Sequence, residues 1–147
     1  MPLVLKKILA LVIGLAVCVA TVALLEQLNH SLFIPESAST ADAHDPSVAR
    51  TFMENLPVAA YLMVLIAWLA GTSLGIVSAS WLIQRVSRLF VPVITGLMLL
   101  STIANFYLLP HPIWLVVAAI VLIPLTGFAT GWLLSRKFNV LVPQEQP

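Results

Sequence analysis

The sequence predicts an all-α integral membrane protein, built as a bundle of four transmembrane helices. Hydrophobic residues occupy 61% of the 147 positions and charged residues only 9%, which is too apolar for a water-soluble domain of this size. A bilayer core about 30 Å thick requires about 20 apolar residues per helix, and the chain contains four such segments. We place them at residues 5–28, 56–83, 89–109 and 113–135, all in one membrane domain.

The first span carries Lys6 and Lys7 at its start, followed by an uncharged apolar run. A cleaved signal peptide has the same outline, but here the apolar run continues past every pair of small residues at which cleavage would occur. We therefore expect a retained anchor. Gly14 lies on a face of small residues that another helix can approach closely. Cys18 lies beside that face, and we expect it to pack there.

Residues 29–55 form a polar segment that we assign to one long outer loop. Asp45 and Pro46 are typical of a helix N-cap followed by proline in the first turn. Val48 and Phe52 lie four positions apart, and so on one side of such a helix. The loop is expected to carry a short helix on the membrane surface.

The second span contains a stripe of small residues, in which Ala67, Gly71, Gly75 and Ala79 recur every fourth position. Such a stripe lets another helix backbone come close. Trp68 lies beside it, and we expect this ring to pack in the core rather than to serve as a platform for a ligand.

Polar side chains mark the third span and a second glycine pair marks the fourth. Thr95, Thr102 and Asn105 share one helical face, which should turn inward because a buried amide facing lipid would have no hydrogen-bond partner. In the fourth span Gly127 and Gly131 again stand four residues apart, and they form a further candidate packing surface.

The basic residues predict the orientation. With four spans, six of the seven fall on one side of the membrane, and the positive-inside rule then makes both termini cytoplasmic in an inner membrane. The remaining one, Arg50, falls on the outer side. Interfacial aromatic residues agree with this arrangement, with Tyr107 and Trp114 expected at the outer surface and Trp81 and Trp132 at the inner one.

One pair of residues suggests chemistry. Glu26 and His30 lie four apart at the outer end of the first span, so their side chains meet if the helix extends that far. Together with His44 they are a candidate proton or metal site. The sequence contains no glycine-rich phosphate loop, nucleophile elbow or His-Glu zinc motif and no basic nucleic-acid patch. We therefore expect no cofactor and no nucleic-acid partner, and we favour a non-enzymatic role over an enzymatic one.

The chain resembles a group of small bacterial membrane proteins with four spans. The resemblance covers the first half of the chain and implies a fold and an inner-membrane location, without an activity. It rests on Ile34-Pro35 and Asp42 in the loop, on Leu56-Pro57 at the entry of the second span, and on Ala67-Trp68 with Gly71 and Gly75 within that span.

Three functions remain as hypotheses. The leading one is an accessory, assembly or interaction subunit that works through helix–helix packing, with a second copy or another membrane protein as its partner in the bilayer. The alternative is a carrier or pore for a small uncharged or apolar solute, lined by Thr95, Thr102 and Asn105. The third is a membrane enzyme or metal site that uses Glu26 and His30.

Overall fold

The computed structural model describes residues 3–33, 55–84, 86, 89–109 and 111–141, and these ranges contain helices and no strand. The expected loop helix at 45–52 and His44 lie outside them. Four of the helices are long and apolar enough to cross a membrane, as predicted. They are α1 (Leu3–Phe33), α4 (Val58–Ile83), α5 (Phe90–Leu108) and α6 (Ile113–Leu141).

The first and last helices of the chain are longer than the spans predicted from the sequence. The helix α1 continues to Phe33, and α6 continues past its basic pair to Leu141. At 1.5 Å per residue the 31 residues of α1 measure about 46 Å, against a bilayer core of about 30 Å. Such a helix must tilt in the bilayer or extend beyond its core, and Glu26 and His30 lie in the C-terminal turns of α1.

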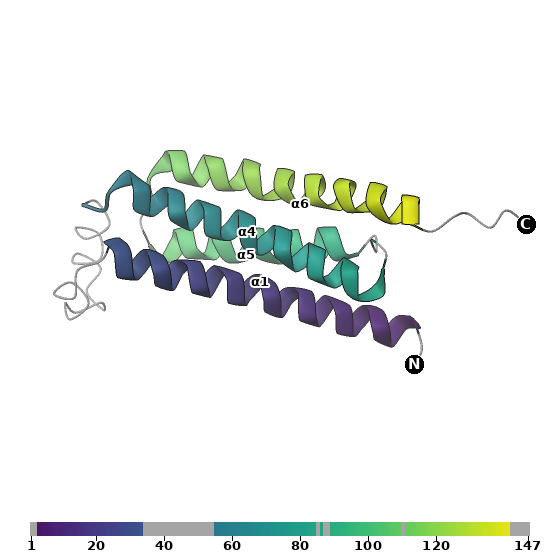
Figure 1. Cartoon of the computed structure of the whole chain (residues 1–147). Helices are drawn as coiled ribbons and strands as arrows, with labels where there is room; N and C mark the ends of the chain where they lie inside the picture. Colours follow the sequence, from purple (N-terminus) through teal and green to yellow (C-terminus); the bar gives the residue numbers. More distant parts are fainter. Residues whose placement is uncertain (1–2, 34–54, 85, 87–88, 110, 142–147) are drawn as a thin grey trace, which may run out of the picture.

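The helices form an antiparallel bundle in which consecutive helices run in opposite directions (Figure 1). The helix α4 contacts all three of the others, with its largest interface on α1, while α5 packs against α6, α4 and α1. Both described ends of the chain, the start of α1 and the end of α6, lie at one end of the bundle (Figure 1).

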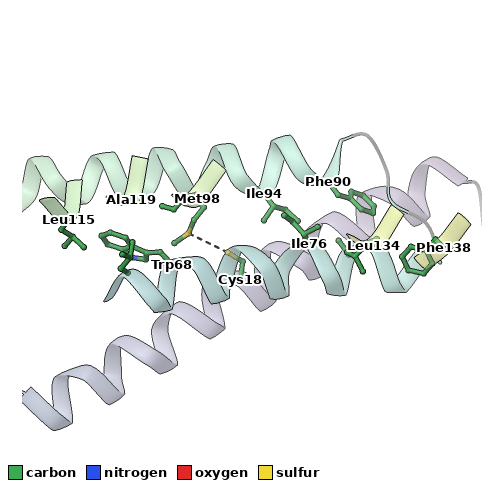
Figure 2. Packing of buried hydrophobic residues seen from close by; sticks show 14 of the residues in the cluster. Cys18, Trp68, Ile76, Phe90, Ile94, Met98, Leu115, Ala119, Leu134 and Phe138 are labelled. Atoms are coloured by element: carbon green, nitrogen blue, oxygen red, sulfur yellow. Dashed lines mark hydrogen bonds between the residues drawn. The ribbon is translucent and has the colours of Figure 1, made fainter. Parts of the chain in front are cut away.

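Branched apolar side chains fill the space between the helices. Ile76, Ile94, Leu115 and Ile123 are fully buried there, and Figure 2 shows how side chains from different helices meet. Large apolar side chains also cover much of the outside of all four helices. In water such a surface would aggregate, whereas in a bilayer it is the surface that meets lipid.

Local sequence explains how several helices begin and end. Gln84 ends α4 in the left-handed conformation, with φ of 53°, and its backbone N–H donates to the Ser80 and Trp81 carbonyls. Pro92 stands in the first turn of α5, where the missing N–H would have no helical partner. The helix α6 continues through Pro124.

Candidate functional site

The helices α1 and α4 meet backbone to backbone at a pair of glycines. A Cβ atom added to Gly14 would lie 2.7 Å from the Gly75 carbonyl oxygen, and one added to Gly75 would lie 2.9 Å from the Gly14 carbonyl oxygen. Carbon and oxygen atoms without a bond do not approach so closely, so neither position has room for a side chain. This close approach is what a stripe of small residues permits between membrane helices.

The contact continues along both helices. A Cβ on Gly71 would lie 2.6 Å from Cγ2 of Val22 and 3.0 Å from the Cys18 carbonyl oxygen. The Cβ of Ala79 stands 2.8 Å from the position of a Gly14 Cβ. Ile94 on α5 packs at the same crossing, with side-chain carbons 3.3 Å from the Cβ positions of both Gly14 and Gly75. Three helices therefore interlock at this point.

A second close contact joins α5 to α6. A Cβ on Gly127 would collide with Oγ1 of Thr95 and lie 3.0 Å from its Cγ2. One turn further along, a Cβ on Gly131 would lie 2.6 Å from Cγ2 of Val91. The two pairs follow the antiparallel register of the helices.

The seven residues expected to pack helices thus have defined positions. Gly14, Gly71, Gly75 and Ala79 lie in the α1–α4 contact and Gly127 and Gly131 in the α5–α6 contact, while Ala67 is fully buried on α4. All are covered within one chain. A partner protein would have to use a different surface.

The three residues expected to line a path for a solute lie in different environments. Thr95 packs against Gly127 in the α5–α6 contact, as described above, and its hydroxyl has no hydrogen-bond partner. Thr102 is 1% exposed, and its hydroxyl is also unpartnered. Asn105 is half-buried. A further buried, unpartnered hydroxyl belongs to Ser80 on α4, a position that sequence reasoning did not single out because Ser80 is one of three serines in this helix and no spacing distinguishes it.

Glu26 and His30 both lie on α1, four residues apart near its end. Glu26 is half-buried and His30 is exposed. Within the described ranges no group of three His, Cys, Asp or Glu side chains is placed to hold a metal ion. A structural zinc site uses four ligands and a catalytic one usually three, so these two residues supply too few by themselves.

Sequence reasoning missed a cluster of rings around His111, at the end of the bundle where α4 and α6 begin. The ring of His111 lies 5.1 Å from Phe106 and 6.4 Å from both Tyr61 and Trp68, measured between centroids. Trp114 meets Tyr61 edge to face at 6.3 Å. Nδ1 of His111 lies 2.7 Å from the Leu109 carbonyl oxygen and donates to it, because a carbonyl can only accept.

Trp68 is only 2% exposed and meets Phe106 edge to face at 5.7 Å. Its expected role in core packing is confirmed. Rings from α4, from α5 and from the turn before α6 therefore pack together and join these three parts of the chain. The sequence did not reveal this cluster, because its aromatic residues lie far apart in the chain.

The side of α1 that faces away from α4 is exposed and has a regular pattern. Seven residues on this side follow one another at alternating spacings of four and three positions, which is the heptad repeat found where helices pack against each other. All seven are exposed, and the central three are alanines. We call this surface the outer face of α1; it consists of Leu9, Ile13, Ala16, Ala20, Ala23, Gln27 and His30.

Comparison of the chain with protein-family models, with curated proteins and with solved structures finds no match. Its function is therefore inferred from its own packing and charges.

The close packing of α1 on α4 predicts that an added methyl group lowers stability at Gly75 but not at Gly96, which lies outside this contact. Gly75→Ala should lower the free energy of unfolding by about 1–3 kcal/mol, the usual cost of overpacking, because the new Cβ would meet the Cys18 Cβ at 2.9 Å and the Gly14 carbonyl oxygen. Gly96→Ala is the matched control, since its Cβ would meet nothing within 4 Å. It should be neutral or stabilising by roughly 0.5–1 kcal/mol. Unfolding in mild detergent with increasing SDS measures both, and equal effects would contradict the packing described above.

Proposed function

We propose that the protein is a small accessory or assembly subunit of the inner membrane, which binds another membrane helix along the outer face of α1. The observation that supports this proposal is the exposed heptad of that face. Membrane helices associate through close van der Waals contact at small residues rather than through the hydrophobic effect, since lipid tails are as apolar as the helices. Ala16, Ala20 and Ala23 are the side chains that allow such contact.

Several large side chains are exposed on the other helices. Leu100 on α5 and Leu125 and Phe128 on α6 are large and exposed, as expected for side chains that meet lipid. On α1 the exposed alanines lead to Gln27, which is also exposed. A glutamine amide both donates and accepts hydrogen bonds, and such groups join membrane helices across their interface. A spacing of 3.5 residues favours a left-handed crossing.

The proposed orientation has both termini in the cytoplasm. Four basic residues within the described ranges, Lys6, Lys7, Arg136 and Lys137, belong to the end of the bundle where the described chain begins and ends (Figure 1). Glu26 lies near the opposite end of α1. Basic residues flank membrane helices on the cytoplasmic side, which supports this orientation.

Blocking the outer face of α1 should weaken the interaction. We expect a photo-crosslinking residue at Gln27 to give a crosslinked product in native membranes, and Ala20→Leu to reduce that product at least about fivefold, which corresponds to a loss of about 1 kcal/mol. A product of twice the monomer mass identifies a second copy, and any other mass identifies a different protein. Ala129→Leu on α6, also at an exposed alanine, is the control and should change nothing. Absence of product from the chain that carries the crosslinking residue and no other substitution would refute the proposal.

The orientation is tested by labelling single cysteines in a Cys18→Ser background. A membrane-impermeant maleimide added to intact cells should modify Leu109→Cys, at the end of α5, and spare Leu3→Cys, at the start of α1. Leu3→Cys should react once the cells are opened. The reverse pattern would place both termini outside.

The solute carrier remains a second candidate. The observation in its favour is that Ser80, Thr95 and Thr102 bury hydroxyls without a hydrogen-bond partner, since an unsatisfied buried polar group is costly. Against it, large apolar side chains fill the core between the helices. Flux of small uncharged solutes into proteoliposomes that is lost in Thr102→Val would favour the carrier. Equal flux with and without the protein would exclude it for those solutes.

A further inference from the structure

Two basic side chains at the end of α6 lie against tryptophan rings. The Lys137 ammonium nitrogen lies 5.2 Å from the ring centroid of Trp81 on α4, so this contact joins two helices. The guanidinium carbon of Arg136 lies 3.7 Å from the ring centroid of Trp132 on α6 itself. Both distances are within the range of a cation–π interaction. Each cation is held beside a ring, yet keeps its charge and its N–H donors.

No carboxylate within the described ranges neutralises these charges. Glu26 is the one acidic residue in those ranges, and it lies 19 positions beyond Lys7 along α1, which is about 28 Å at the helical rise. Arg136 and Lys137 are exposed, as is Lys6. This end of the bundle therefore presents positive charge for which the described residues offer no counter-ion.

The rings also set the depth of these cations in a membrane. Trp81 is 53% exposed and Trp132 45% exposed, and exposed tryptophans on membrane helices lie at the level of the lipid headgroups. A cation held against such a ring lies at the depth of the lipid phosphates. Arginine and lysine are the side chains that bind phosphate, arginine through paired N–H donors and lysine as a point charge.

We propose that the ends of α4 and α6 form a binding site for the phosphate of an anionic phospholipid, with Lys137 and Arg136 as donors. Trp81 positions Lys137, because it belongs to the neighbouring helix and so fixes the lysine between α4 and α6. The site differs from a diffuse positive surface in depending on Lys137 more than on other lysines at the same end. It does not depend on whether α1 binds a partner.

The test uses quenching of tryptophan fluorescence in vesicles of phosphatidylcholine that contain brominated phosphatidylglycerol or, for comparison, brominated phosphatidylcholine. We expect the wild-type chain to prefer the anionic lipid. Lys137→Gln should reduce this preference about fivefold, which corresponds to about 1 kcal/mol. Lys137→Arg should retain it. Lys6→Gln is the matched control, since it removes the same charge at the same end, from a side chain that lies over no aromatic ring within the described residues, and it should retain the preference as well.

Two further measurements separate the remaining explanations. Trp81→Phe should remove the part of the quenching that responds to Lys137, which identifies Trp81 as the reporter ring. Inorganic phosphate at millimolar concentration should not alter the lipid preference. Equal losses in Lys6→Gln and Lys137→Gln, no preference in the wild-type chain, or displacement by inorganic phosphate would each overturn the proposal.

Discussion

The contact between the backbones of Gly14 and Gly75 is the constraint on which the bundle depends. In a bilayer the hydrophobic effect does not drive helices together, so their association relies on dispersion forces and on hydrogen bonds between them. Dispersion weakens steeply once a gap opens. Because neither glycine has a side chain, each carbonyl oxygen reaches the partner helix. The same crossing receives Ile94 of α5, which makes it a junction of three helices.

The contact between α5 and α6 also depends on glycines, but here side chains rather than backbone atoms pack against them. Thr95 and Val91 on α5 fit against Gly127 and Gly131 on α6, so a branched side chain enters the space left by each glycine. Between the two pairs, the hydroxyl of Thr130 on α6 donates to that of Ser73 on α4 at 3.4 Å. The contact between α1 and α4 is the most extensive one in the bundle, and α6 packs against both α4 and α5.

This arrangement changes where a function can reside. The glycines of α1, α4 and α6 are covered within the chain, so a partner helix would have to bind another surface, for which we propose the outer face of α1. The two ends of the bundle have different chemistry, with cations on tryptophan rings at one end and His111 among aromatic rings at the other. A partner or lipid can therefore distinguish one end from the other.

The sequence by itself determined the class of protein, the number of long apolar helices and which positions carry small side chains, because span length and four-residue spacing are local properties of the chain. It also placed Trp68 in the core. Only the tertiary structure decided that Gly71 and Gly75 meet α1, that Thr95 fits against Gly127 rather than facing an open path, and that His111 lies among three rings. A periodic stripe specifies a face of a helix but not the neighbour that covers it. In a bilayer, where lipid and protein surfaces are equally apolar, that choice depends on the shape complementarity of residues far apart in the chain.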